Sequence, residues 1–315
     1  MIGRRVAIVG AGAVGASTAY ALALSGTCHE IILYDIMPEV AIGKAIDIAQ
    51  ATNYSLRGTV VRGVRTPEEI KDCDVVVITA GVPRKKDMTR ADLLNINASI
   101  VKQVSENIKK HSPEAIILCV SNPLDVMTFV VQKITGWERH RVIGMSGALD
   151  GSRMAYQIYQ KTGFGASQTR AMVIGEHGEN MIPYPEVTDV GGVPLTQILS
   201  KEDIEDVVQK TKNGGAEIVK HLKTSAFYAP GRAISAMVES ILSDEDKVIA
   251  SCAILDGEYG YKDVAIGVPC VLGASGIKKI IELDFDDKTK EKFDIAVKSI
   301  KENIAILENG GFFDK

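Results

Sequence analysis

Hydrophobic and polar residues follow two different periods along the first half of the chain. Four short apolar runs rich in Val and Ile predict strands buried on both faces, at residues 6–10, 31–35, 74–80 and 115–121. Apolar positions at helical spacing predict helices over 14–24, 38–51, 92–110 and 124–134. This alternation predicts an α/β fold with a doubly wound parallel sheet of the Rossmann type, with helices on both faces.

The pattern changes after about residue 144. Strand-like runs at 170–175, 248–254 and 264–271 alternate less regularly with helical patterns at 151–162, 201–223, 232–243 and 288–308. We therefore predict a first domain of residues 1–144 and a second, α+β domain of residues 145–315. No Pro- or Ser-rich linker separates the two halves, so we expect them to share an interface.

A glycine-rich motif, G-A-G-A-V-G at residues 10–15, joins the first predicted strand to the first predicted helix. Gly10 permits a tight turn, Gly12 lets the backbone approach a pyrophosphate, and Gly15 lets helix and strand pack closely. Asp35 ends the second predicted strand and can accept hydrogen bonds from ribose hydroxyls while repelling a 2′-phosphate. The motif predicts NAD rather than NADP, and a first domain that binds a dinucleotide; the alternative is a glycine-rich turn without a ligand.

Composition and charge exclude several classes of protein. The 315 residues are 46% apolar and 24% charged, with a net charge of 36 − 40 = −4, so we expect neither a nucleic-acid partner nor a membrane partner. Arg4 and Arg5 precede an apolar stretch at 6–24 that resembles a signal peptide, but its three glycines would weaken an apolar helix. Five widely spaced cysteines without a C-x-x-C motif argue against disulfides or a zinc site and fit a reducing, cytoplasmic compartment (Cys28, Cys73, Cys119, Cys252 and Cys270).

Four further segments carry polar groups that a scaffold would not need. The loop at 80–94 holds four cations and two anions and could close over an anionic substrate, or it could be a solvated loop. Asn122, in S-N-P-L-D, either faces a ligand crevice or caps a helix. Asp150 and Arg153 can face one side of a helix or form a local cap and ion pair. His177, between a strand end and Gly178, suits proton exchange near neutral pH.

These side chains together fit the reduction of a keto-acid by a hydride. His177 can donate the proton that the forming alkoxide needs, and Asp150 can hold its imidazole and stabilise the charged form. Arg153 can bind a substrate carboxylate through two parallel hydrogen bonds. Arg90 can polarise the carbonyl when the loop shuts.

The order and spacing of G-A-G-A-V-G, T-A-G-V-P-R-K, S-N-P-L-D, L-D-G-S-R and G-E-H-G resemble the lactate and malate dehydrogenase superfamily along nearly the whole chain. The resemblance implies a catalytic pair of Asp150 and His177, a carboxylate anchor at Arg153, and a mobile-loop arginine at Arg90, with Asn122 contacting substrate and cofactor. It also implies a set of NAD contacts, which are Gly10, Gly12, Ala13, Val14, Gly15, Asp35, Thr79, Ala80, Gly81, Asn97, Val120 and Asn122.

The resemblance also implies a substrate. Malate-type members carry Arg at the position of Arg84, where lactate-type members usually carry Gln, and lactate-type members tend to have Thr at the position of Ala226. Glu176 departs from this pattern, because it is commoner in lactate-type members. We therefore expect reversible hydride transfer between (S)-malate and oxaloacetate, with both carboxylates of the substrate bound.

Members of this group are commonly dimers or tetramers, and we expect a homotetramer that serves the tricarboxylic acid cycle. Three alternatives differ in the activity that they assign to the same residues. They are an L-lactate dehydrogenase, an NAD-dependent glycosidase, which would need a Cys/His metal site in the second domain, and a non-catalytic NAD-binding protein.

Overall fold

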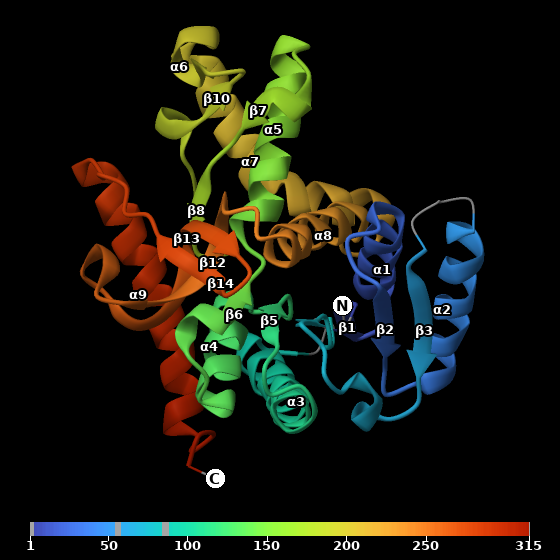
Figure 1. The fold of residues 1–315 in the computed structure, drawn as a ribbon. Helices are drawn as coiled ribbons and strands as arrows, with labels where there is room; N and C mark the ends of the chain where they lie inside the picture. Colours follow the sequence, from blue (N-terminus) through green and yellow to red (C-terminus); the bar gives the residue numbers. More distant parts are fainter. Residues whose placement is uncertain (1–2, 54–57, 84–87, 315) are drawn as a thin grey trace.

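A computed structural model describes residues 3–53, 58–83 and 88–314. Within these residues, the first half of the chain forms six parallel strands, ordered β3-β2-β1-β4-β5-β6 (Figure 1). The chain moves outward in one direction from β1 to β3 and in the other from β4 to β6, so a switch point lies between β1 and β4, where ligands of such sheets bind. The strands are β1 (Arg5–Val9), β2 (Glu30–Tyr34), β3 (Val60–Val64), β4 (Val75–Ile78), β5 (Ile116–Cys119) and β6 (Val142–Gly144).

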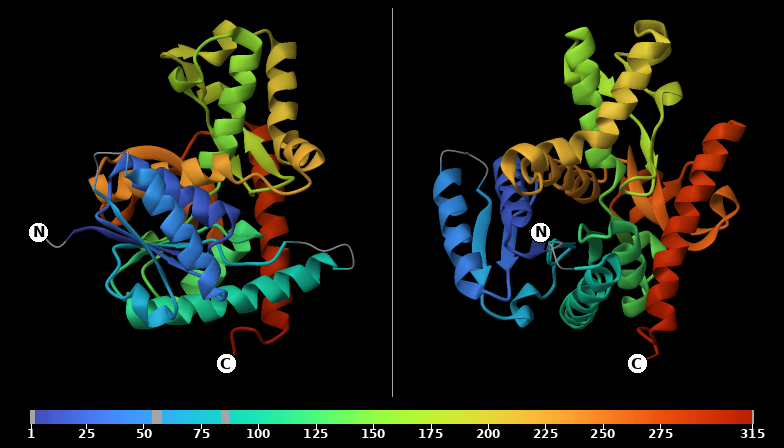
Figure 2. Two further views of the ribbon diagram at one scale, coloured as in Figure 1. Left: turned by 90° about the vertical axis from the view of Figure 1, so that its right-hand side faces the viewer. Right: turned by 180° about the vertical axis from the view of Figure 1, so that it is seen from behind.

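The helices of the first half begin and end close to their predicted bounds. They are α1 (Ala13–Ser25), α2 (Pro38–Thr52), α3 (Arg90–His111) and α4 (Leu124–Thr135). Thr89 caps α3, because its hydroxyl accepts a hydrogen bond from the N–H of Asp92 at 3.0 Å. α1 packs against α2, whereas α3 packs against α4, and the two pairs cover opposite faces of the sheet (Figure 2). The predicted doubly wound sheet is therefore confirmed.

The sheet does not end with the first half of the chain. β12 (Lys247–Asp256) lies beside β6, with Cys252 opposite Gly144, and continues the sheet through antiparallel strands. A Cβ atom on Gly144 would lie 2.7 Å from that of Cys252, so the close approach of the two strands requires glycine. The remaining strands of this sheet are β13 (Lys262–Gly273), β8 (Val173–Gly175), β9 (Met181–Pro183) and β14 (Gly276–Ile280).

Helices of the second half pack on both parts of the molecule. α8 (Tyr228–Ser243) lies against α1, and α9 (Asp287–Asn309) runs along the other side against α3 and α4, red in Figures 1 and 2. α5 (Gly147–Thr162) and α7 (Lys201–Leu222) project upward in Figure 1 with a small second core that includes Met154 and Val207. The short elements there are β7 (Thr169–Arg170), β10 (Asp189–Val190), β11 (Val193–Pro194) and α6 (Leu195–Ile198).

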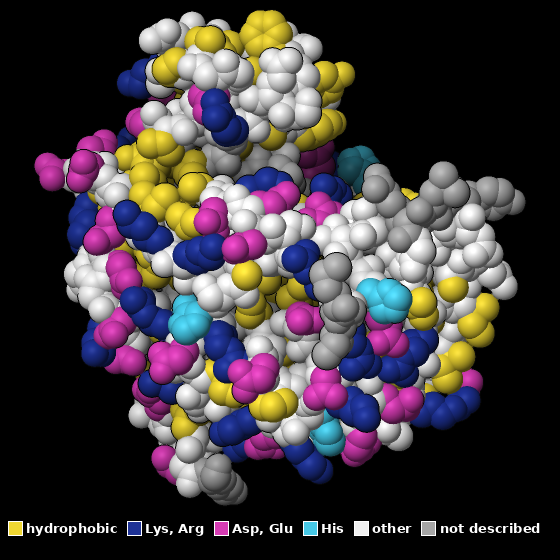
Figure 3. Space-filling view, in the orientation of Figure 1, with side chains coloured by type: hydrophobic (Ala, Val, Ile, Leu, Met, Phe, Trp, Pro, Cys, Tyr) yellow, Lys and Arg dark blue, Asp and Glu magenta, His cyan; other side chains and the backbone are white. Residues whose placement is uncertain are grey.

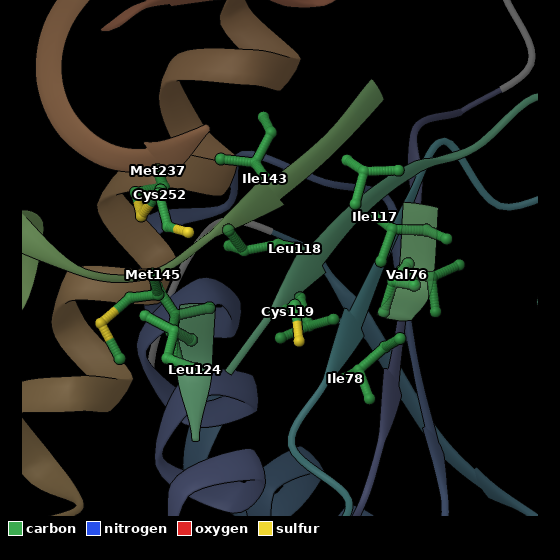
Figure 4. Packing of buried hydrophobic residues seen from close by; sticks show 14 of the residues in the cluster. Val76, Ile78, Ile117, Leu118, Cys119, Leu124, Ile143, Met145, Met237 and Cys252 are labelled. Atoms are coloured by element: carbon green, nitrogen blue, oxygen red, sulfur yellow. The ribbon is translucent and has the colours of Figure 1, made fainter. Parts of the chain in front are cut away.

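One buried core joins the two halves. Figure 4 shows Ile117, Leu118 and Cys119 of β5 in one cluster with Cys252 of β12 and Met237 of α8. All five side chains are buried. This shared core fixes the position of α5 and β8, which carry candidate site residues, relative to the nucleotide-binding sheet.

Several predicted elements of the second half were wrong in extent. The strand expected at 170–175 is two strands, because β7 pairs with β10 in a small separate sheet while β8 pairs with β13. α5 begins at Gly147 rather than at residue 151. A Cβ atom on Gly147 would lie 2.2 Å from the carbonyl oxygen of Val173, so the start of this helix requires glycine. α8 begins at Tyr228 rather than residue 232, since Pro230 is tolerated in a first turn. In the first half, β3 and β6 were not predicted, because Arg62 and Gly63 interrupt the apolar run of β3 and β6 is only three residues long.

The lengths of the helices and the charges on the surface are relevant to the membrane and nucleic-acid partners considered above. In the described part of the chain, no helix is both long enough and apolar enough to cross a membrane. The apolar stretch after Arg5 is divided between β1 and α1. On the face drawn in Figure 3, acidic and basic side chains are interspersed.

The aromatic core beneath α9 gives a test of the fold. Phe293 is fully buried, and its ring centre lies 5.1 Å from Tyr259 and 5.2 Å from Phe285. We expect Phe293→Ala to lower the free energy of unfolding by about 3–5 kcal/mol in urea denaturation, because it leaves a cavity. Ile295, on the same helix but 51% exposed, is the control. Ile295→Ala should cost about 0.5 kcal/mol or less, and equal losses in both variants would contradict this packing.

Candidate active site

The turn between β1 and α1 has little room for side chains at two of its glycines. Gly10 has φ +109°, and a Cβ there would lie 2.6 Å from the hydroxyl oxygen of Thr79. A Cβ on Gly15 would lie 2.0 Å from the carbonyl oxygen of Gly10. At Gly12, by contrast, a Cβ would meet no described heavy atom within 4 Å. Gly12 also precedes α1 without a side-chain cap, so the first turn presents N–H groups to open space, as a pyrophosphate requires.

Asp35 follows β2 and shapes this glycine-rich turn. Its carboxylate accepts hydrogen bonds from the N–H of Ala11 at 2.7 Å and from the N–H of Met37 at 2.9 Å. Each oxygen keeps a second lone pair, and the half-buried carboxylate places a negative charge beside the turn. This arrangement fits ribose hydroxyls and opposes a 2′-phosphate.

Lys44 of α2 was not predicted to take part in this turn. Its ammonium group donates to the carbonyl oxygen of Ala11 at 2.6 Å. Asp35 binds the N–H of Ala11 and Lys44 binds its carbonyl oxygen, so both backbone groups of this residue are hydrogen-bonded. The sequence carried no signal for this contact, because a lysine on an amphipathic helix is ordinarily a solvated surface residue.

A cavity of about 500 Å³ opens beyond the carboxyl ends of β4 and β5. It brings together residues from both halves of the chain, including many of those predicted from the sequence. The lining residues predicted as site residues are Val14, Thr79, Ala80, Gly81, Asn97, Val120, Asn122, Arg153 and His177, and the others include Met145, Leu149, Gly215, Val219, Ser225, Ala226 and Pro230.

Asn97 and Ser121 tie two loops of this cavity together. The buried amide of Asn97 accepts from the N–H of Val82 at 2.8 Å and donates to the carbonyl oxygens of Val82 and Asn122 at 3.2 and 2.7 Å. The hydroxyl of Ser121 donates to the carbonyl oxygen of Ala80. Neither Ser121 nor Asn122 caps α4, whose preceding residue is Pro123 without a side-chain cap, so the capping alternative is wrong.

His177 and Asp150 meet at the inner wall of the cavity. Nδ1 of His177 lies 2.7 Å from Oδ2 of Asp150, and the two side chains are 15% and 1% exposed. The N-cap residue of α5 is Ser146. Asp150 therefore lies in the first turn of α5 and is not its N-cap. Because Nδ1 is engaged, Nε2 is the ring nitrogen left to exchange a proton with a ligand.

Arg153 lies one turn after Asp150 and bonds to its other oxygen. Nη1 of Arg153 donates to Oδ1 of Asp150 at 2.7 Å. Nε of Arg153 is buried and has no hydrogen-bond partner among residues 3–53, 58–83 and 88–314. The guanidinium packs beside Gly215 of α7, which also lines the cavity. Because Arg153 lines the cavity, its cation can attract an acceptor such as a carboxylate there.

The charges around His177 favour the imidazolium ion. Burial disfavours that ion, but the carboxylates of Asp150 and Asp125 outweigh burial and raise the pKa of His177 above its ordinary value. The guanidinium of Arg153 acts in the opposite direction. His177 can therefore hold a proton at neutral pH and donate it to an oxygen that becomes negative in the cavity.

Asp125 is the last residue of the S-N-P-L-D motif, and no role was predicted for it. It lies on α4, is 3% exposed, and accepts a hydrogen bond from the backbone N–H of His177 at 2.8 Å. Burial raises the pKa of its carboxyl to about 6, against the opposing effect of that N–H. An aspartate within the apolar run of residues 124–131 was the available signal.

The two loop arginines are not part of the cavity wall that the structure describes. Arg90 is the first residue of α3, and its exposed guanidinium pairs with Glu179 at 3.1 Å. This ion pair ties Arg90 to the loop that carries His177, although Arg90 does not line the cavity among the described residues. Arg84, predicted to bind the second carboxylate of the substrate, lies outside the described residues.

Comparisons with known proteins identify the family. The model of the lactate/malate dehydrogenase NAD-binding domain matches residues 4–144, and that of the α/β C-terminal domain matches residues 147–309. The chain is 50% identical to the malate dehydrogenase of Sulfurimonas denitrificans, over 99% of this chain and 98% of the relative.

Two solved structures are similar over nearly their whole length. The malate dehydrogenase of Picrophilus torridus in its apo form has a TM-score of 0.95 at 38% identity, covering 99% of this chain and 100% of that one. The lactate dehydrogenase of Cryptosporidium parvum, complexed with lactic acid and nicotinamide adenine dinucleotide, has a TM-score of 0.93 at 34% identity, covering 98% and 99%. The chain belongs to the lactate/malate dehydrogenase family.

Proposed function

We propose that the protein acts as an NAD-dependent malate dehydrogenase that interconverts (S)-malate and oxaloacetate. The observation that carries this proposal is the buried Asp150–His177 pair beside Arg153, whose Nε has no partner in the described part of the chain. A proton donor and a carboxylate anchor in one cavity are what a 2-hydroxy acid or 2-keto acid needs. The identity to malate dehydrogenases over the full length of the chain supports the choice of substrate.

The cofactor contacts follow from the glycine-rich turn. The first turn of α1, from Gly12 onward, would hold the pyrophosphate of NAD, and Asp35 would accept from its ribose hydroxyls. Thr79, Ala80 and Gly81 would line the nicotinamide side of the groove. When bound, NADH supplies the hydride that the protein itself lacks. The same turn contains Gly10, Ala13, Val14 and Gly15, and Val120 and Asn97 lie in the adjoining wall.

Each side chain near the reacting centre would have one task. His177 donates its Nε2 proton to the substrate oxygen during reduction and takes it back during oxidation. Asp150 holds the ring through Nδ1 and stabilises the imidazolium ion, as the distance of 2.7 Å supports. The guanidinium of Arg153, which lines the cavity, would bind the carboxylate next to the reacting carbon.

The loop before α3 would complete the site by closing. Arg90 begins this helix, and its ion pair to Glu179 is exposed, so breaking that pair costs little. Brought over the cavity, Arg90 would polarise the carbonyl and exclude water. Asn122 would contact both the substrate and the cofactor from the β5–α4 turn. Arg84 would bind the second carboxylate of oxaloacetate.

Finer properties of the protein are proposed on the same basis. We propose a division into residues 1–144 and 145–315, supported by family models that meet between 144 and 147. We also propose a homotetramer, or else a dimer, because Tyr20, Ile46 and Tyr228 on α1, α2 and α8 are exposed apolar residues. Five buried free thiols support a cytoplasmic enzyme, in which interconversion of malate and oxaloacetate would serve the tricarboxylic acid cycle.

The preference for NADH over NADPH tests the role of Asp35. We expect NADH to bind at least about 10-fold more tightly, because the carboxylate accepts from the ribose and repels a 2′-phosphate. In fluorescence titrations, Asp35→Ser should lower the ratio of the NADPH Kd to the NADH Kd. Asp47→Asn, which removes an exposed carboxylate from α2, should leave the ratio unchanged. Equal affinities for both cofactors in the unmodified protein would contradict the role.

Substrate choice separates the proposed function from the lactate dehydrogenase alternative. We expect kcat/KM for NADH-dependent reduction to favour oxaloacetate over pyruvate by about 10³-fold. Two charge effects of about 2 kcal/mol each, attraction of the second carboxylate and an unpaired Arg84 with pyruvate, give that ratio.

Arg84→Gln should remove most of this preference, and Lys86→Gln, which removes a nearby loop cation, is the control. A preference of the unmodified protein for pyruvate would overturn the malate assignment. If Arg84→Gln leaves the ratio of kcat/KM for oxaloacetate to that for pyruvate unchanged, another residue determines substrate specificity.

A further inference from the structure

Asp125 is a buried carboxylate that the proposed reaction does not use. Its Oδ2 accepts the backbone N–H of His177 at 2.8 Å, and the thiol of Cys252 also donates to the carboxyl. No N–H or O–H group among the described residues bonds to Oδ1. Its chain neighbours Leu124 and Val126 are both buried. Leu124 belongs to the core drawn in Figure 4. Removing an ionised carboxylate from water is costly, so a favourable interaction must offset part of that cost.

Building on the proposed function, we infer that Asp125 is a positioning residue for the proton donor. It fixes the backbone of His177 through the N–H hydrogen bond, and its negative charge favours the imidazolium ion. His177 is thus held by two carboxylates, with Asp150 bonded to the ring and Asp125 bonded to the main chain.

The neighbouring charges explain why a second carboxylate matters. Asp150 is shared between His177 and Arg153, so the cation of Arg153 offsets part of the negative field that Asp150 creates at the ring. Asp125 has no such cationic partner within hydrogen-bonding distance in the described residues, and His177 is the positive group that faces it. The charge of Asp125 therefore acts on the imidazole without being neutralised elsewhere.

The surroundings of Asp125 contain few other titratable groups. Glu176 faces it from the loop that carries His177, Cys252 faces it from β12, and Cys119 from β5. Burial raises the pKa of both thiols, so they stay neutral at physiological pH. Glu176 accepts hydrogen bonds from Asn180 and Ser299, which hold its carboxylate.

The pKa of Asp125, which burial raises to about 6, determines how its charge affects His177 at each pH. Above that pH the carboxylate is ionised and raises the pKa of His177. Reduction of the keto-acid needs protonated His177, so kcat/KM for reduction should be highest below the pKa of His177 and fall as the pH rises through it. Losing the charge of Asp125 should move that fall to lower pH.

Asp125→Asn tests this inference, because the amide oxygen can still accept the N–H of His177 while the charge is lost. We expect the His177 pKa, followed by NMR of the imidazole in the NAD complex, to fall by about one unit. The pH profile of kcat/KM with oxaloacetate should shift by the same amount, with NADH affinity unchanged. Asp263→Asn, which removes an exposed carboxylate from β13, is the control and should shift neither.

Asp125→Ala removes both the acceptor and the charge, so its maximal rate should fall further than that of Asp125→Asn. If Asp125→Asn does not fold, Asp125→Ser, a smaller neutral acceptor, is measured in the same way. An unchanged His177 pKa in the folded neutral variants would overturn the inference and leave Asp125 a structural residue. The NMR titration remains decisive even if the unmodified protein fails to reduce oxaloacetate, which would overturn the proposed function instead.

Discussion

Nδ1 of His177 lies 2.7 Å from a carboxylate oxygen of Asp150 in a buried wall of the cavity, and the other features of the site are arranged around this contact. It leaves Nε2 as the ring atom that faces a ligand and favours the protonated form of the ring. The second oxygen of Asp150 holds Arg153, so one carboxylate orients both the proton donor and the anchor for an acidic substrate. A misplaced Asp150 would therefore disturb two functions at once.

The contact can form only because the sheet crosses from one half of the chain to the other. Asp150 lies on the helix that follows β6, and His177 follows β8, which joins the same sheet through β13. Gly144 lets β12 approach β6 closely, and Gly147 lets α5 pass the carbonyl of Val173. These two close contacts bring the acid/base pair to the carboxyl ends of β4 and β5, beside the glycine-rich turn. The catalytic geometry thus depends on packing between residues that lie far apart in the sequence.

The sequence predicted local features better than distant ones. Four strands of the first half (β1, β2, β4 and β5) and its four long helices follow from periodicity. Steric limits account for Gly10 and Gly15, and helical spacing accounts for the pairing of Asp150 with Arg153. Contacts between distant segments could not be predicted in this way, such as Lys44 on the glycine-rich turn or the amide of Asn97 between two loops. The split of residues 170–175 between two sheets was missed for the same reason, because a short apolar run does not specify its partner.

The dependence of the site on Asp150 is tested most directly by the pH profile of oxaloacetate reduction in Asp150→Asn. The amide preserves the shape of the side chain but stabilises neither the imidazolium ion nor the cation of Arg153. The account predicts that kcat/KM falls by about 10²-fold or more, since that is the contribution of a positioned proton donor, and that the apparent pKa of His177 falls as well. A variant that keeps more than about a tenth of the activity with an unchanged pH profile would contradict it.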